Sequence, residues 1–187
     1  MTILLAFFVI ALLLGWAALI GSRLPKTHVC ASRQFLDVPV DEVWAIVTNF
    51  TEYPTWRPGL ARVDDGPMID GQPSWFEYCS PKIKVHLQVS ECEPQKRLVT
   101  RLAGTNLSIF GAWEYEFVEE NGGTLLTITE RDKVYNPLLR FFTQFVIPHH
   151  AAMDVFLIAL ARHYGSNSTP VHLSLRVDDM TPDATKF

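Results

Sequence analysis

The most pointed candidate for chemistry in this sequence is Glu130, which lies in a stretch of alternating side-chain character. Because side chains alternate across a strand, Glu130 shares the face of Leu126 and Ile128, which is expected to be buried. A carboxyl group there would be desolvated with a raised pKa, and could act as a polar anchor for a ligand or as a general acid or base. The alternative is a place at the end of the sheet, where Glu130 is solvated or paired with Arg101 or Arg131.

A second group of polar residues invites a metal interpretation. His150 and Asp154 lie four residues apart, on one face of an expected helix, with His149 beside them. Two ligands do not complete a site, and no HExxH motif or comparable third ligand accompanies them. We therefore expect no metal and no cofactor, and interpret the histidines as surface or kink-filling residues. No Ser-His-Asp or Cys-His arrangement and no glycine-rich phosphate loop is visible, which favours a binding protein over an enzyme.

A third set of residues is of the types that line pockets for apolar ligands. Bulky aromatic and aliphatic side chains recur along the expected strands and the expected carboxy-terminal helix. The expected pocket residues are Trp75, Tyr78, Val85, Leu87, Trp113, Tyr115, Phe117, Ile128, Glu130, Phe142 and Met153. For any single residue an ordinary core position is the favoured interpretation, and for the set we expect a mixture of pocket wall and core, which the sequence does not separate.

The elements that must position these residues are short strands. Period-two alternation predicts strands at 31–36, 61–64, 74–79, 83–92, 97–102, 109–118 and 124–134, with a turn at 119–123. A helix introduced by Pro39 and Asp41 follows the first strand, and a second helical turn is expected at 50–53, ended by Pro54. The pattern predicts a curved antiparallel sheet with one apolar, aromatic face.

One long helix is expected at 136–165 to cover that face. Asn136 has the N-cap position, Pro137 the first helical position, and Gly165 the position after the end. Apolar residues recur at three- and four-residue steps along its length, and Pro148 predicts a kink. The expected fold class is therefore α+β, with a helix packed on an antiparallel sheet.

The amino-terminal run Ile3 to Ile20 is uncharged and apolar, and as a helix it would cover about 27 Å, close to the hydrocarbon thickness of a bilayer. A cleaved signal peptide is the alternative, but no Lys or Arg precedes the run and no clear small-x-small cleavage site follows it. We expect a single-pass membrane anchor. Because Arg23, Lys26 and Arg33 follow the run, the remaining domain is expected in the cytoplasm.

Composition excludes some partners. Sixteen Lys and Arg against twenty Asp and Glu give a formal charge of -4, which offers no basic field for nucleic acid. Cys30, Cys79 and Cys92 lack CxxC spacing and are interpreted as free thiols. The expected organisation is an anchor at 1–22, a linker at 23–29, one domain at 30–165 and a flexible tail at 166–187, which is rich in Ser, Thr, Asp and Pro.

Two segments carry a family resemblance. FLDVPVDEVWAIVTNFTEYPTWRPG (35–59) resembles the opening of the START-like superfamily, also called SRPBCC, in its polyketide cyclase/dehydrase and lipid-transport branch. WEYEFVEENGGTLLTITERDKV (113–134) resembles the last hairpin of that family, and the resemblance covers about residues 31–165. It implies a helix-grip fold of the Bet v 1-like type, in which a curved sheet and the long helix enclose a hydrophobic cavity. Periodicity alone does not imply a hollow, since apolar faces that meet usually pack solid.

Three functions remain open at this point. The first is a membrane-anchored domain that binds a hydrophobic small molecule or lipid in its cavity as a carrier, sensor or presenter. The second is a cyclase/aromatase-type enzyme in which Glu130, Tyr115 or a pocket Arg transfers a proton, although no residue set here matches a cyclase active site. The third is a protein-interaction module whose cavity is filled by its own side chains. A buried acid with an ordered hydrogen-bond partner would favour the second function over the first.

Overall fold

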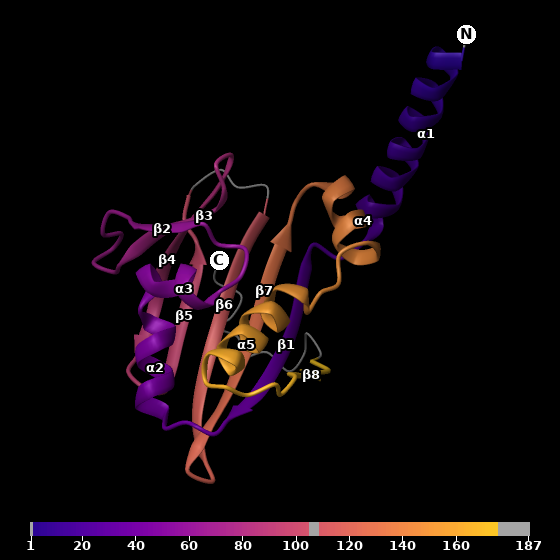
Figure 1. Cartoon of the computed structure of the whole chain (residues 1–187). Helices are drawn as coiled ribbons and strands as arrows, with labels where there is room; N and C mark the ends of the chain where they lie inside the picture. The colour runs from indigo at the N-terminus through magenta and orange to yellow at the C-terminus, as the bar shows by residue number, and fades with distance from the viewer. Residues whose placement is uncertain (1, 105–108, 176–187) are drawn as a thin grey trace.

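A computed structural model describes residues 2–104 and 109–175. It contains an antiparallel sheet with helices against one face and one helix that projects away from the domain (Figure 1). The helices are α1 (Thr2–Arg23), α2 (Val40–Thr48), the 3-10 turn η1 (Phe50–Glu52), α3 (Tyr53–Trp56), α4 (Pro137–Phe145) and α5 (Ala151–His163). The strands are β1 (Thr27–Leu36), β2 (Arg62–Asp65), β3 (Ser74–Ser80), β4 (Ile83–Glu93), β5 (Arg97–Leu102), β6 (Ile109–Glu120), β7 (Gly123–Val134) and β8 (Val171–Leu173). The predicted α+β class is confirmed.

The sheet has the order β2-β3-β4-β5-β6-β7-β1-β8, and every neighbouring pair is antiparallel. Asn121 and Gly122 join β6 to β7 with φ values of 51° and 81°, as a tight hairpin turn requires. The register of β7 places Trp113 of β6 opposite Glu130 and Cys30 of β1 opposite Glu130 on its other side. This register decides which side chains of β7 face the helices.

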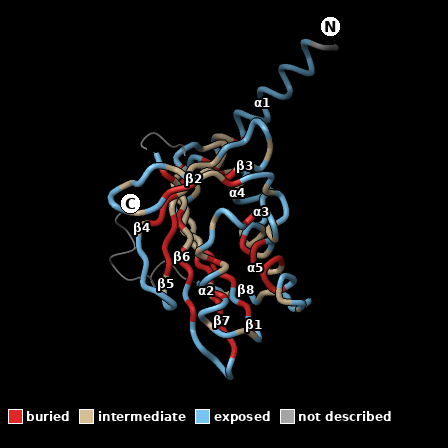
Figure 2. Tube along the Cα trace, turned by 60° about the vertical axis from the view of Figure 1, so that its left-hand side comes forward, coloured by how far each residue is buried: buried red, intermediate tan, exposed pale blue. Residues whose placement is uncertain are grey.

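The core lies between the sheet and α5. Leu126 and Ile128 of β7 and Met153, Phe156 and Leu160 of α5 have no exposed surface. Buried residues concentrate along the sheet and α5, whereas α1 is mostly exposed (Figure 2). Each fully buried side chain of this size stabilises the fold by about 1.5–3 kcal/mol before entropy is counted.

The predicted single helix at 136–165 is instead two helices. The side chain of Asn136 accepts hydrogen bonds from the backbone N–H groups of Leu138 and Leu139, so α4 starts as predicted. The chain leaves helical geometry between α4 and α5, where Pro148 lacks the N–H that a continuous helix needs. Only α5 lies against the sheet, and α4 packs on the carboxy-terminal end of α1 (Figure 1).

Close packing of α1 on α4 depends on Gly21. A Cβ atom at this position would lie 1.8 Å from the carbonyl oxygen of Pro137, a backbone atom that has little freedom to move. Gly15, two turns earlier in α1, has no atom within 4 Å of its equivalent position. Residues Leu4–Arg23 are long and apolar enough to cross a membrane, with a mean hydropathy of 2.6.

Three local expectations differ from the structure. Pro54 does not end the helical turn at 50–53, because it occupies the first turn of α3, where its missing N–H has no helical partner to lose. The linker is shorter than expected, since only residues 24–26 separate α1 from β1. The expected flexible tail contains β8, which pairs with β1 from Ala31 to Arg33, while residues 176–187 lie outside the described part.

Candidate functional site

A cavity of about 190 Å³ lies on the sheet face that carries α5, and we call it the inner cavity. Tyr53 of α3 forms part of its wall and is fixed by its hydroxyl, which donates to the carbonyl oxygen of Val47 in α2 at 2.7 Å. Neither α4 nor α5 contributes a described lining residue. The wall is formed by Tyr53, Arg57, Trp75, Glu77, Val85, Leu87, Thr100, Leu102, Gly111, Trp113, Tyr115, Glu130 and Asp132.

Glu130 is held between two neighbouring strands. The indole Nε1 of Trp113 donates to Glu130 Oε1 at 2.8 Å, and Cys30 Sγ lies 3.9 Å from Oε2. Burial raises the pKa of Glu130, and these two hydrogen bonds oppose the rise. Neither arginine considered as a partner pairs with Glu130, because Arg131 pairs with Glu114 and Arg101 lies 3.9 Å from Asp70.

Asp132 adds a second carboxyl group to the inner cavity. Burial, together with the neighbouring charge of Glu130, raises the pKa of Asp132 to about 7. Gly111 lies opposite on β6, and a Cβ atom there would come within 2.8 Å of Asp132 Oδ1, so glycine leaves room for the carboxyl group. The sequence reasoning missed Asp132, although the same alternation that selects Glu130 places residue 132 on the same face.

A partly buried ion pair forms the other polar part of the inner cavity. Arg57 Nη1 donates to Glu77 Oε1 at 2.9 Å, and Trp75 Nε1 donates to the same oxygen at 3.2 Å. The guanidinium carbon of Arg57 lies 4.9 Å from the ring centre of Tyr53 and 5.2 Å from that of Phe156. The pair is therefore neutral overall and stacked on aromatic rings, which suits a largely apolar wall.

Nine of the eleven expected pocket residues lie on the inner side of the fold. Those that line the inner cavity are Trp75, Val85, Leu87, Trp113, Tyr115 and Glu130. Those that are buried in the core without lining it are Phe117, Ile128 and Met153. The aromatic set is thus a mixture of wall and core.

Tyr78 and Phe142 do not belong to the inner cavity. Tyr78 is three residues from Trp75 on β3, an odd step, so the two side chains point to opposite faces of the sheet. Its ring lies 4.3 Å from the guanidinium carbon of Arg62. Phe142 is 37% exposed, because α4 leaves the sheet for α1.

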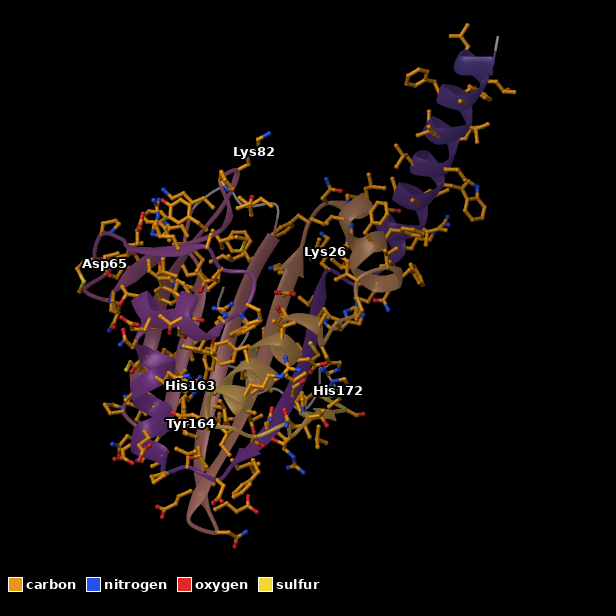
Figure 3. All side chains as sticks on the ribbon, in the orientation of Figure 1. Lys26, Asp65, Lys82, His163, Tyr164 and His172 are labelled. Atoms are coloured by element: carbon orange, nitrogen blue, oxygen red, sulfur yellow. The ribbon has the colours of Figure 1, made fainter. Side chains whose placement is uncertain are left out.

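The histidines form a seam at the edge of the sheet. The rings of His28 and His149 stack with centres 3.8 Å apart, and those of His150 and His172 stack at 3.9 Å. Asp154, near the start of α5, accepts a hydrogen bond from His172 Nε2 at 2.9 Å. His172 is labelled in Figure 3. Within residues 2–104 and 109–175 no group of three or more His, Cys, Asp or Glu is arranged to hold a metal ion. The seam joins the α4–α5 connection to β1 and β8.

The curved antiparallel sheet, the packed helix and the inner cavity define a helix-grip domain of the SRPBCC, or Bet v 1-like, class. The model of the family described as polyketide cyclase/dehydrase and lipid transport matches residues 27–164, and the chain belongs to that family. No curated protein sequence matches the chain.

Solved structures share the fold. The Zhui aromatase/cyclase from Streptomyces sp. R1128 superposes with a TM-score of 0.59 at 13% identity, over 74% of this chain and 94% of that one. Norcoclaurine synthase from Thalictrum flavum superposes with a TM-score of 0.57 at 9% identity, over 74% of this chain and 86% of that one. The di-domain ARO/CYC StfQ from the steffimycin biosynthetic pathway gives 0.57 at 11% identity over 75% of this chain, which spans about half (53%) of StfQ. At these identities the likeness shows the fold alone.

Proposed function

We propose that this chain is a membrane-anchored domain that binds a hydrophobic small molecule or lipid in its inner cavity, as a carrier, sensor or presenter. The observation that supports the proposal is the wall of the inner cavity, which is mostly aromatic and aliphatic apart from Thr100 and the Glu130–Asp132 and Arg57–Glu77 pairs. Binding sites for apolar ligands have this composition. The ligand therefore has an apolar body and at least one group that hydrogen-bonds to a carboxyl.

The volume of the inner cavity limits the ligand further. About 190 Å³ is less than the roughly 300–1,000 Å³ of pockets that enclose drug-sized molecules. A compact ring system, or one end of a longer molecule, fits this volume without movement of the wall. A complete two-chain lipid requires Arg57 or its neighbours to shift.

The proposed anchor is α1. Its length and hydropathy suit a membrane span, and its apolar side chains are exposed along most of its length. A signal sequence passes the same test of composition, but the close approach of Gly21 to Pro137 ties α1 to the folded domain, which a leader destined for removal does not need. Arg23 and Lys26 favour a cytoplasmic domain.

Native mass spectrometry and lipid extraction of the full chain, purified in a mild detergent, test ligand binding. We expect a co-purifying apolar molecule, and loss of that molecule in Leu87→Trp, which fills the inner cavity. Ile83→Trp is the matched control, because Ile83 lies on the same strand and is 56% exposed. A wild-type chain that is empty and takes up no fluorescent lipid would overturn the proposal in favour of the interaction module.

The second proposed function, acid–base catalysis, is favoured by one specific observation. Glu130 is a partly buried acid with an ordered hydrogen-bond partner, and beside it Asp132 has a pKa of about 7, which suits proton transfer near neutral pH. The reaction class is cyclisation with loss of water from a reactive chain held in the inner cavity. Incubation of the recovered ligand with wild type, Glu130→Gln and Asp132→Asn, followed by mass analysis, tests it. Conversion by the wild type but not by the variants supports catalysis, and an unchanged ligand argues against it.

A further inference from the structure

A smaller cavity lies between the α1–β1 connection, β1, β7 and α4, and we call it the junction cavity. Its volume is about 100 Å³, and it is lined by Leu24, Lys26, His28, Asp132, Arg140 and His149, among others. Lys26 lies beside α4 at the start of β1 (Figure 3). The junction cavity is separate from the wall formed by Tyr53, Trp75 and Tyr115, and the two share only Asp132.

The unusual group in the junction cavity is Arg140. Its side chain belongs to a residue that is only 7% exposed, and its Nη1 donates to the carbonyl oxygen of Leu24 at 2.7 Å. Its Nε has no hydrogen-bond partner among the described residues. Arg140 also forms no ion pair with any carboxylate of residues 2–104 or 109–175. Within the described part of the chain, the buried guanidinium thus has no charge partner, and the acceptor it contacts is the backbone carbonyl of Leu24, just after α1.

Burial of a charge is unfavourable unless an opposite charge accompanies it. The carboxy-terminal end of α1 supplies a partial negative charge at most. The described acid that lines the junction cavity is Asp132, which forms no ion pair with Arg140, and its raised pKa of about 7 leaves it only about half ionised at neutral pH. Lys26 adds a second cation, and the imidazoles of His28 and His149 add ring N–H donors. Among the described residues, the junction cavity thus holds two cations against one partly ionised carboxyl group.

We propose that the junction cavity binds a phosphate group, with Arg140 and Lys26 as its cationic contacts and the ring of His28 or His149 as a further donor. Arginine presents donors in a fork that matches phosphate oxygens, and lysine acts on them as a point charge. A volume of about 100 Å³ holds roughly three water-sized groups, enough for a phosphate head and too small for an acyl chain.

A phospholipid and a soluble phosphate ester share this chemistry, and position favours the phospholipid. This choice of source rests on the proposed membrane anchor: the apolar run ends at Ile20, so the phosphates of a surrounding bilayer lie near the level of Arg23 and Lys26. The neighbouring chain is also apolar and exposed, with Phe145 at 60% and Val146 at 61%, which suits contact with lipid.

The test uses the full chain in dodecyl maltoside micelles with three probes: inorganic phosphate, dioleoyl phosphatidic acid, and dioleoyl glycerol, which has the same chains without phosphate. Binding is measured by thermal shift and native mass spectrometry. We expect phosphatidic acid to bind and dioleoyl glycerol not to bind at this site. Lys26→Gln and Arg140→Gln should weaken phosphatidic acid binding by at least about tenfold, and Arg140→Lys by less.

Two controls keep the test decisive. Lys26 is exposed, so Lys26→Gln reports on binding even if Arg140→Gln fails to fold. Arg33 is also exposed, and Arg33→Gln, which removes a charge elsewhere on β1, should leave phosphatidic acid binding unchanged. Leu87→Trp should block the inner cavity and leave phosphate binding intact, so failure of this proposal is distinguishable from failure of the proposed function. Binding of both phosphate probes supports the site, binding of inorganic phosphate alone assigns it to a soluble ester and refutes the lipid source, and binding of neither overturns it.

Discussion

Trp113 and Glu130 face each other across β6 and β7, and the indole Nε1 donates to the carboxylate at 2.8 Å. The hydrogen bond favours the ionised carboxylate, while burial favours the neutral acid and prevails, so the pKa of Glu130 is raised. The protonation state of Glu130 is therefore set mainly by burial, which the hydrogen bonds from the Trp113 indole and the Cys30 thiol oppose. The partner of that indole is chosen by strand register, not by loop conformation.

Trp113→Phe removes the donor and keeps much of the apolar surface. The pKa of Glu130 should rise further, because burial then acts with only the thiol of Cys30 opposing it. We expect the free energy of unfolding to fall by about 1–3 kcal/mol at pH 8 and by less at pH 4, where the acid is protonated. Urea unfolding at both pH values measures the difference, with Trp44→Phe as a control for lost indole packing. Equal losses at pH 4 and pH 8 would contradict the assigned role.

Asp132→Asn should be more stable than the wild type, by a difference that grows as the pH rises. The pKa of Asp132 is about 7 in the folded chain against an ordinary 3.8, so between these values the folded state binds more protons and stability falls with rising pH. The variant should gain roughly 1–2 kcal/mol over wild type by pH 8, after allowance for partial solvent access. Thermal unfolding from pH 4 to pH 8 measures this gain, with exposed Asp65→Asn as the control. A difference that does not change with pH would refute it.

His28 should produce the opposite trend. Burial and the charges of His149 and His150 lower the pKa of His28 to about 4, so between pH 6.5 and pH 4 the unfolded chain binds more protons. Stability should therefore fall as the pH drops through this window, and His28→Gln should flatten the fall. Because Asp132 acts in the other direction, the comparison belongs in an Asp132→Asn background. His163→Gln, outside the seam, is the matched control, and an unchanged slope in His28→Gln would count against the effect.

Gly21→Ala should separate α4 from α1. The added Cβ atom would lie 1.8 Å from the carbonyl oxygen of Pro137, so one helix must shift. Overpacking of this kind lowers stability by about 1–3 kcal/mol. Hydrogen exchange of α4 and thermal unfolding in detergent measure the effect, and Gly15→Ala, which meets no atom within 4 Å, is the control. Equal hydrogen exchange and equal thermal unfolding in the two variants would show that the contact between α1 and α4 does not contribute to stability.

Much of the sheet was predictable because its signals are local. Alternation along β7 selects the inner face, and the Asn121-Gly122 pair fixes the hairpin that sets the register with β6. The placement of Glu130 follows from these two features. The error at Tyr78 was avoidable, since an odd step from Trp75 along one strand changes the face.

The remaining features depend on contacts that the chain makes at long range. The apolar residues of α4 suit packing on a sheet or on another helix equally, and local sequence does not say that the partner is α1. Pro148 predicts an interruption without giving the direction in which the next helix continues. Arg57 and Glu77 are 20 residues apart and meet only through the fold, and a hollow between apolar faces leaves no periodic signal.

The three residues between α1 and β1 have one further consequence. Fully extended, they span roughly 11 Å, and the contacts of Gly21 and Arg140 hold them closer still. A domain that carries a ligand between two membranes needs a long, flexible connection to its anchor, and the connection at 24–26 is short and held by contacts. If α1 is a membrane anchor, as proposed, the short connection holds the domain at a nearly constant height above the bilayer. Under that proposal, the short connection favours a sensor or presenter over a carrier that moves between two membranes.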